Sequence, residues 1–284
     1  MELKVSEEVT NLLADRVEHV RQKALNIRKH ICKMINNSGS GHPGGSLSVT
    51  DIMATLYFGG ILKYDPKKPQ LNERDYLILS KGHAAPALYA VLAEAGFFPV
   101  QHLNSLRKLG SPLQGHPDKR SLPGIEMSTG SLGQGLSASV GLTAALRLDN
   151  KSNRVVCVMG DGELQEGQIW EAAMSAAHYK LGNLTAVIDR NCLQIDGTTE
   201  EVMALGDVAK KFEAFGWKVI KVDGHNCEQL LHAFDKDQIE PTKPLLVLAN
   251  TVKGKGVSFM EHNLKFHGTA PTCEECERAL QELV

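Results

Sequence analysis

A glycine-flanked aspartate and an asparagine follow two consecutive apolar runs of the sequence and together could hold a divalent cation. Gly160-Asp161-Gly162 directly follows the apolar run 155–159, and Asn191 comes just after the run 184–189. Glycine lets the backbone approach a phosphate closely, and a carboxylate is a hard oxygen ligand that suits Mg²⁺. The carboxyl ends of parallel strands meet at one sheet edge, so a right-handed connection brings both side chains together.

Taken alone, the tripeptide is better explained as an ordinary turn, and Asn191 as an ordinary loop residue. The apolar run before it, the spacing of about thirty residues to Asn191 and the following Leu193-Gln194-Ile195-Asp196-Gly197 favour a metal site. Magnesium prefers about six oxygen ligands, several of them from water or phosphate. Two side chains, one backbone carbonyl and a diphosphate would nearly complete that shell.

Of the histidines that stand next to a glycine at expected loop tips, four are candidates for acid–base chemistry over a structural role. They are His42, His83, His116 and His267. Histidine titrates near neutrality, so one side chain can both accept and return a proton. We expect about one of the four to be mainly structural.

The elements that would position these groups alternate along the chain. The pattern predicts strands at 76–80, 155–159, 184–189, 217–222 and 245–250. It predicts helices at 9–35, from Ser48 and Asp51 to 58, through 88–92, and at 133–148, 166–180, 207–215, 227–234 and beyond a Thr272–Glu275 cap. Such alternation indicates right-handed βαβ units and an α/β fold with a doubly wound, mostly parallel sheet flanked by helices. We expect one domain spanning 1–284.

Composition excludes several classes of protein. The 284 residues are 42% hydrophobic and 23% charged, with a formal net charge of −2. A nucleic-acid partner would require a clustered basic excess, and a membrane helix would require about 18 apolar residues in a row. We therefore expect no nucleic acid and no membrane partner. The polar start MELKVSEEVT does not resemble a signal peptide, and six scattered cysteines suit reduced thiols in the cytoplasm.

A series of short motifs, in family order along the chain, resembles transketolase. The motifs are 40–45 (Ser-Gly-His-Pro-Gly-Gly), 80–84, 115–117, 129–135, the thiamine diphosphate motif from Gly160 to Asn191, 164–167, 170–172, 196–197 and 266–268. The resemblance implies a thiamine diphosphate-binding domain of the diphosphate type, with thiamine diphosphate and Mg²⁺ as cofactors. Asp161, Asn191 and the carbonyl of Leu193 would hold the metal.

The resemblance also assigns residues to the cofactor and to the substrate channel. Residues implied to contact thiamine diphosphate are His83, Leu132, Gly133, Gly160, Asp161, Gly162, Glu163, Asn191 and His267. Residues implied to act in catalysis are His42, His116 and His267 in the sugar channel, with Glu166 and Glu171 at a subunit interface. The reaction implied is transfer of a two-carbon ketol unit from a ketose phosphate to an aldose phosphate.

Transketolases carry a further half that contains the glutamate activating the aminopyrimidine and the arginines gripping the sugar phosphate. The resemblance covers this chain but only the first half of that machinery. It therefore implies the N-terminal subunit of a split transketolase, active with a separate C-terminal subunit in a two-plus-two heterotetramer.

Other interpretations remain open at this point. The chain could serve another thiamine diphosphate enzyme, such as deoxyxylulose-5-phosphate synthase, or a transketolase of unusual sugars, or a non-enzymatic assembly protein. The segment Lys253-Gly254-Lys255-Gly256 resembles the corresponding segment of deoxyxylulose-5-phosphate synthase. Its lysines could bind an anionic group, or they could be solvated side chains of an ordinary glycine turn. The pair Cys273 and Cys276 has metal-like spacing but no second pair, which favours a helix start over zinc.

Overall fold

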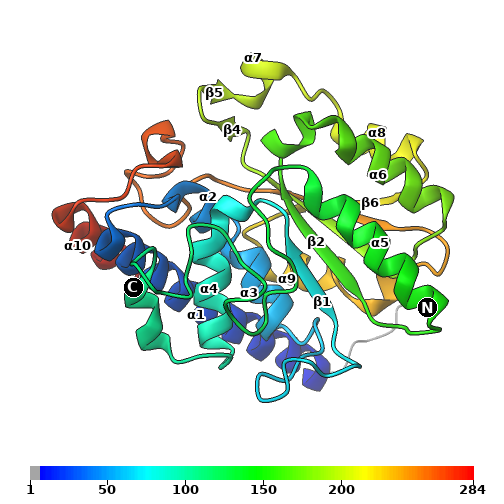
Figure 1. Ribbon diagram of the computed structural model, residues 1–284, viewed down its shortest axis with the longest axis horizontal. Coiled ribbons are helices and arrows are strands. Elements are labelled where there is room, and N and C mark those ends of the chain that lie inside the picture. The colour runs from blue at the N-terminus through cyan, green and yellow to red at the C-terminus, as the bar shows by residue number, and fades with distance from the viewer. Residues whose placement is uncertain (1–6) are drawn as a thin grey trace.

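Five parallel strands form the central sheet of the protein (Figure 1). The computed structural model describes the backbone of residues 7–284 and the side chains from residue 11. The strand order is β1 (Tyr76–Leu79), β2 (Val155–Gly160), β3 (Leu184–Arg190), β7 (Leu245–Asn250) and β6 (Lys218–Asp223). Every neighbouring pair is parallel, so the predicted doubly wound α/β fold is confirmed.

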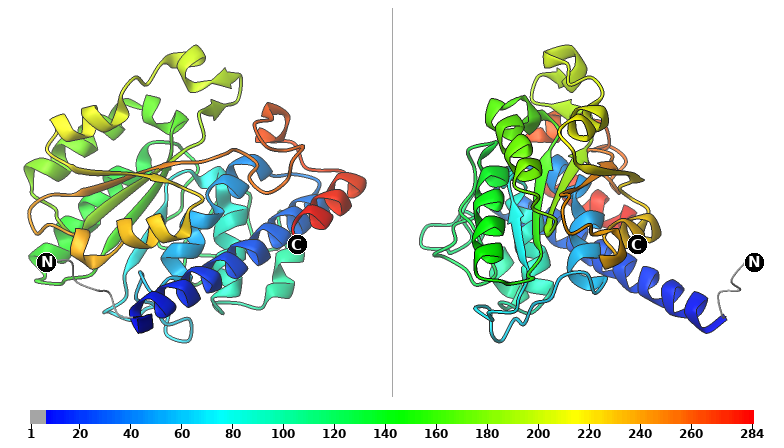
Figure 2. Two further views of the ribbon diagram at one scale, coloured as in Figure 1. Left: turned by 180° about the vertical axis from the view of Figure 1, so that it is seen from behind. Right: turned by 90° about the vertical axis from the view of Figure 1, so that its right-hand side faces the viewer.

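Helices cover both faces of the sheet (Figure 2). One face packs against α5 (Gln134–Leu148), α6 (Gly167–His178) and α8 (Val208–Ala214). The opposite face packs against α1 (Glu7–Ser38), α3 (Thr50–Phe58), α4 (Ala85–Glu94) and α9 (Cys227–Ala233), and α10 (Cys273–Glu282) lies on α1. Short 3₁₀ turns connect these elements: Gly82–Ala84, Val100–Ser105, Gly162–Gln165, Lys236–Gln238 and Leu264–His267.

Strand β2 illustrates why a continuous apolar run in the sequence predicts a strand of this sheet. All six of its residues are buried. Val156 and Val158 belong to the core under α1 and α4, whereas Cys157 and Met159 belong to the core under α5 and α6. Because successive side chains point to opposite faces and both faces are covered, the strand must be apolar throughout.

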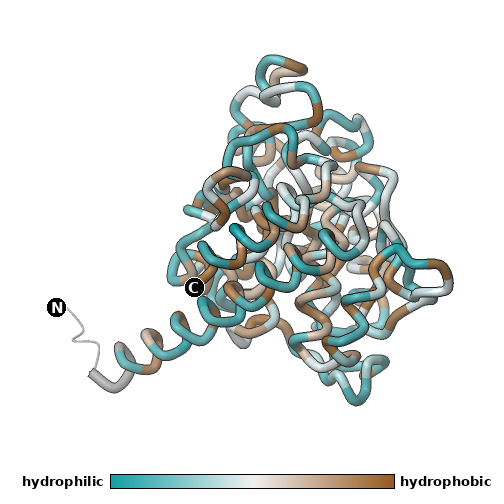
Figure 3. Tube along the Cα trace, turned by 90° about the vertical axis from the view of Figure 1, so that its left-hand side faces the viewer, coloured by the Kyte–Doolittle hydropathy of each residue, from teal (hydrophilic) through white to brown (hydrophobic). Residues whose placement is uncertain are grey.

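The long helix α1 is buried along only part of its length. Val20, Ile27 and Ile35 are fully buried, as their spacing predicts. Leu12, however, is 72% exposed, so the buried stripe is shorter than predicted. The first turns of the helix extend beyond the body of the molecule (Figure 3). The side chain of Val9 and most of the polar N-terminus lie outside the described residues.

The predicted helix start at Ser48 and Asp51 is wrong. A short helix α2 (Pro43–Ser48) comes first, and α3 begins after Val49 without a side-chain cap. The Ser48 hydroxyl donates instead to Asp189 at 2.6 Å, and Asp51 accepts from Arg28. Both side chains are buried, so tertiary partners take the hydrogen bonds that a surface cap would make.

Besides α2, three further small elements were not predicted: β4 (Leu193–Gln194), β5 (Gly197–Thr198) and α7 (Thr199–Met203). They are too short to show a period, yet they form a projecting hairpin and helix above the sheet (Figure 1). The capping box of Thr272 and Glu275 at the start of α10 is confirmed. Within residues 7–284, no helix is long and apolar enough to cross a membrane.

Candidate active site

A cavity of about 290 Å³ opens at the carboxyl edge of the sheet. Loops after β1, β2, β3 and β7 form its walls, together with the β4 strand and the 3₁₀ turn 264–267. Its lining residues are Gly45, Lys81, His83, Leu132, Gly160, Asp161, Gly162, Glu163, Gln165, Glu166, Asn191, Leu193, Gln194, Ile195, Asp196, Lys253 and His267. This is the edge where ligands bind in open parallel sheets.

Ten of the residues predicted from sequence line this one cavity, and four do not. Gly133 lies next to the lining residue Leu132 as the left-handed N-cap of α5. His42 and His116 lie beside the cavity, with ring centroids 6.4 Å apart. Glu171 lies on an exposed face of α6, away from the cavity, whereas Glu166 is exposed at its rim.

The three predicted metal ligands face the cavity with oxygen atoms. The Asp161 carboxylate accepts hydrogen bonds from the N–H of Gly162 at 2.9 Å and of Cys192 at 2.6 Å. The Asn191 side-chain oxygen accepts from the N–H of Leu193 at 3.2 Å. An all-oxygen set with one carboxylate suits Mg²⁺ and not zinc. Among the side chains that the structure describes, no group of three or more His, Cys, Asp or Glu could hold a metal ion.

Electrostatics at Asp161 also suit a cation. Burial, followed by the neighbouring charge of Asp189, raises the pKa of Asp161 to about 6. A carboxylate whose charged form is disfavoured gains the most from an added positive charge. The donor chemistry of the site therefore fits a magnesium ion.

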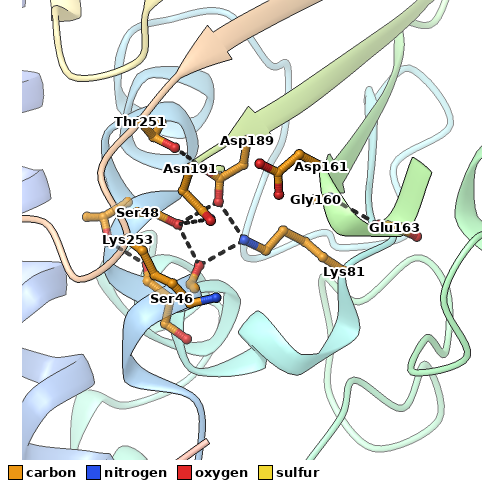
Figure 4. A network of polar contacts seen from close by, with 12 residues as sticks. Ser46, Ser48, Lys81, Gly160, Asp161, Glu163, Asp189, Asn191, Thr251 and Lys253 are labelled. Atoms are coloured by element: carbon orange, nitrogen blue, oxygen red, sulfur yellow. Dashed lines mark hydrogen bonds and ion pairs between the residues drawn. The ribbon is translucent and has the colours of Figure 1, made fainter. Parts of the chain in front are cut away.

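A buried ion pair beneath the cavity was missed by sequence reasoning. Asp189, in β3, is fully buried and accepts hydrogen bonds from Lys81, Ser48 and Thr251 (Figure 4). The Lys81 ammonium also donates to the carbonyl of Gly45 at 3.0 Å. One signal was present: Asp189 is the only charged residue in the mostly apolar strand run 184–189.

The interpretation of Lys253 as a solvated lysine in a glycine turn is wrong, because the side chain is buried. Its side chain is 2% exposed, and its ammonium lies 3.0 Å from the carbonyl of Leu193 and 2.8 Å from Nδ1 of His267. Burial, then the charge of Lys81, lowers the pKa of Lys253 to about 8. Lys255, by contrast, is partly exposed and pairs with Glu261 at 3.5 Å.

Glu163 joins two glycines that border the cavity. Its carboxylate accepts from the N–H of Gly133 at 2.8 Å, the N–H of Gly160 at 3.1 Å and the Ser80 hydroxyl. Burial raises the pKa of Glu163. These contacts fix the turn before α5 against the end of β2, so the side chain holds the backbone that forms the pocket.

Gly160 leaves room for a ligand. A side-chain carbon built on it would meet nothing closer than Lys81, at 3.9 Å. The backbone here is therefore open to close approach by a phosphate, with the stem of Lys81 alongside. A diphosphate fits this combination of open backbone, buried lysines and an oxygen-ligand metal site.

Four histidines gather beside the cavity. The ring of His42 lies 5.5 Å from that of His83, 6.4 Å from His116 and 5.7 Å from His267, measured between centroids. Burial lowers the pKa of His42 and of His267 to about 4; Arg107 adds to the effect at His42 and Lys253 adds to it at His267. Burial likewise lowers the pKa of His83 and of His116. Neutral imidazoles result, which can donate on one nitrogen and accept on the other.

His42 also has unused hydrogen-bonding capacity. Its Nδ1 is buried and has no hydrogen-bond partner among the described residues. Buried polar atoms in proteins are normally satisfied, and exceptions concentrate at functional sites. The atom is therefore available to a ligand that enters beside the cavity.

Fold and pocket together define a class of protein: a parallel α/β domain with a pocket at the carboxyl edge of its sheet whose donor chemistry fits a metal ion and a diphosphate. Residues 20–283 match the family described as "Transketolase, thiamine diphosphate binding domain". The chain belongs to this family. It is of the N-terminal, thiamine diphosphate-binding subunit type that occurs in split transketolases.

Relatives of similar length are named as transketolase subunits. The chain is 46% identical to the 6-deoxy-6-sulfo-D-fructose transketolase subunit of Clostridium sp. (strain MSTE9), over 90% of this chain and 93% of that protein. It is 42% identical to an apulose-4-phosphate transketolase subunit of Phocaeicola vulgatus, over 94% and 95%. Human transketolase is 39% identical over 94% of this chain but only 42% of its own length.

A solved structure agrees with these matches. Transketolase from Campylobacter jejuni superposes with a TM-score of 0.87 at 33% identity, covering 94% of this chain and 43% of that one. The chain thus spans less than half of the single-chain transketolases that it matches.

Proposed function

We propose that this chain binds thiamine diphosphate through Mg²⁺ and transfers a two-carbon ketol unit between sugar phosphates, together with a separate C-terminal subunit. The observation that carries the proposal is the match over nearly the full length of relatives named as transketolase subunits. In this proposal Asp161, Asn191 and the Leu193 carbonyl hold the metal. The cofactor contacts are His83, Leu132, Gly133, Gly160, Asp161, Gly162, Glu163, Asn191 and His267.

Bound thiamine diphosphate supplies a carbon nucleophile for the ketose carbonyl. The chain's own contribution is to bind, orient and move protons. Glu163 holds the backbone under the cofactor, and Lys81 lines the cavity with its ammonium paired to Asp189. His42, His116 and His267, kept neutral by burial, donate to and accept from the sugar oxygens.

A second polypeptide completes the site in this proposal. Ile195 is 69% exposed at the cavity and Met203 is 62% exposed on the neighbouring helix α7, which supports a covering partner. Glu166 and Glu171, both exposed, would lie at the interface of a two-plus-two heterotetramer. We further propose that residues 1–284 form one domain and that the protein acts in the cytoplasm.

A second candidate function is ketol transfer from a less common ketose. Two relatives are named for 6-deoxy-6-sulfo-D-fructose and apulose-4-phosphate. A donor panel of xylulose-5-phosphate, 6-deoxy-6-sulfofructose and apulose-4-phosphate would separate the two candidates by their kcat/KM values.

The decisive assay measures ketol transfer by the purified chain, with and without a C-terminal transketolase subunit, at saturating Mg²⁺ and thiamine diphosphate. We expect turnover only with both subunits. Removing a positioned acid–base group typically costs about 10²–10⁴ in rate, and the chain alone also lacks the partner's phosphate-binding groups. Full turnover by this chain alone would overturn the proposal.

Asp161→Ala tests the metal assignment. We expect the two-subunit complex to lose Mg²⁺-dependent binding of thiamine diphosphate in a calorimetric titration, because one of three ligands is removed. Asp149→Ala, at an exposed aspartate after α5, is the matched control and should bind normally. Unchanged affinity in Asp161→Ala would contradict the metal site.

A further inference from the structure

Lys253 connects two walls of the cavity that are distant in sequence. It follows β7, and its buried ammonium contacts the carbonyl of Leu193 at 3.0 Å and Nδ1 of His267 at 2.8 Å. Leu193 belongs to the β4 strand, and His267 ends the 3₁₀ turn 264–267. The turn and the strand are thus joined through one nitrogen atom.

The position of this ammonium is fixed by the packing of its stem. A side-chain carbon on Gly44 would lie 3.0 Å from Cγ of Lys253 and 2.9 Å from the carbonyl of Phe266. Only glycine allows α2 to pack this closely. The backbone around the lysine is held by hydrogen bonds from Gly254 N–H to the Gly44 carbonyl and from His262 N–H to the Lys253 carbonyl, both 3.0 Å.

Hydrogen-bond chemistry then decides the state of His267. An ammonium has three donors and no lone pair, so it can only donate. Nδ1 of His267 must therefore accept, and a neutral imidazole that accepts on Nδ1 carries its proton on Nε2. The Leu193 carbonyl has two lone pairs, so accepting from Lys253 leaves one for a metal ion.

We propose that Lys253 is a positioning residue that holds His267 in the Nε2–H tautomer and couples its orientation to the Leu193 carbonyl. Nε2 lies on the ring edge opposite the lysine, and His267 lines the cavity, so the tautomer supplies a hydrogen-bond donor to what binds there. The tautomer depends only on contacts within this chain, without cofactor or partner. Its catalytic consequence rests on the proposed function.

The test of the tautomer is ¹⁵N NMR of the histidine-labelled chain at neutral pH. His267→Gln identifies the resonances of His267 by their loss. We expect wild type to show a protonated Nε2 and an unprotonated Nδ1. Lys253→Met removes the donor while keeping an unbranched stem, so the other tautomer should become populated. Lys255→Met, the same change two residues along, should leave the wild-type pattern.

Two outcomes would overturn the inference. One is a proton on Nδ1 of His267 in the wild-type chain, which needs no variant to fold. The other is an unaltered tautomer in a folded Lys253→Met chain. Lys253→Arg keeps a donor-only side chain, and we expect it to restore the wild-type pattern.

The catalytic consequence is measured separately in the two-subunit enzyme at saturating cofactor. Residues that orient a site group through a hydrogen bond typically change activity about 10–100-fold. We expect Lys253→Met to lower kcat by this factor and to change KM for the donor less than about twofold. Wild-type kcat would overturn the positioning role. Absence of ketol transfer in wild type would refute the proposed function instead and leave the NMR result standing.

Discussion

Two buried clusters of charge contact the α2–α3 segment, and they differ in how their charges are compensated. In the first, Asp51 of α3 accepts from Arg28 of α1 at 3.0 and 2.5 Å and contacts Nδ1 of His225 at 2.7 Å. In the second, Asp161, Lys81 and Lys253 line the cavity, and Asp189 pairs with Lys81 beneath it.

The pKa directions separate the two clusters. Burial alone raises the pKa of Asp51, but the charge of Arg28 and the hydrogen bonds from His225 and Arg28 outweigh it and hold the pKa below its usual value. Asp161, similarly buried, has its pKa raised to about 6 by burial and by Asp189. One cluster is electrostatically complete within the chain, and the other is not.

The difference distinguishes structural from ligand-binding charge. A carboxylate paired in a fixed bidentate geometry stabilises the packing of α1 on α3 and has no capacity left for a ligand. A carboxylate left short of positive charge is a site where an added cation gains free energy. Burial alone would not have told them apart.

Arg28→Met should break the complete cluster and give the largest effect on stability. Removing one partner of a buried ion pair leaves an uncompensated charge, which typically costs about 3–5 kcal/mol. Chemical denaturation at neutral pH would measure the free energy of unfolding. Arg21→Met, at an exposed arginine two turns earlier in α1, should stay within about 0.5 kcal/mol of wild type. A loss below about 1 kcal/mol in Arg28→Met would refute this account of the cluster.

Protonation of His42 at acid pH should lower the free energy of unfolding by less than the Arg28→Met substitution does. The pKa of His42 falls from 6.5 in the unfolded chain to about 4 in the folded one. The stability gained by keeping it neutral is present above pH 6.5 and is lost as pH falls toward 4. After discounting for its partial exposure, we expect about 1 kcal/mol between neutral pH and about pH 5.

The measurement is the difference between variants, because Asp161 responds in the opposite direction: its raised pKa makes the folded chain gain stability as the carboxyl protonates. His42→Asn should therefore lose less stability on acidification than wild type. His178→Asn, at an exposed histidine, should behave as wild type. An identical pH response in His42→Asn and wild type would show that His42 does not titrate as described.

Asp161→Asn should have the smallest effect on stability, which sharpens the contrast with Asp51. Removing the charge relieves an electrostatic cost of about 3 kcal/mol at neutral pH. Against this, one of the hydrogen bonds from Gly162 and Cys192 is lost, at about 1–3 kcal/mol. We expect the free energy of unfolding in the absence of cofactor to stay within about 1 kcal/mol of wild type. A loss like that in Arg28→Met would mean that Asp161 is structural.

The strands and most of the helices could be predicted because their signals are local. An apolar run such as 155–159 and the helical spacing of Val20, Ile27 and Ile35 record burial directly in the order of residues. The short elements β4 (Leu193–Gln194) and α2 (Pro43–Ser48) contain neither a continuous apolar run nor enough positions for a helical period, so the pattern missed them.

The sequence by itself determined the α/β class, the family and the loop in which each site residue lies, since the succession of strands and helices along the chain and the motifs between them are encoded locally. Only the tertiary structure decided the partners of the buried charges. Lys81 and Asp189 are 108 residues apart, and Lys253 and Leu193 are 60. A charged side chain looks the same in sequence whether solvated or buried. Its partner, and hence its pKa and role, depends on which distant segments the fold packs around it.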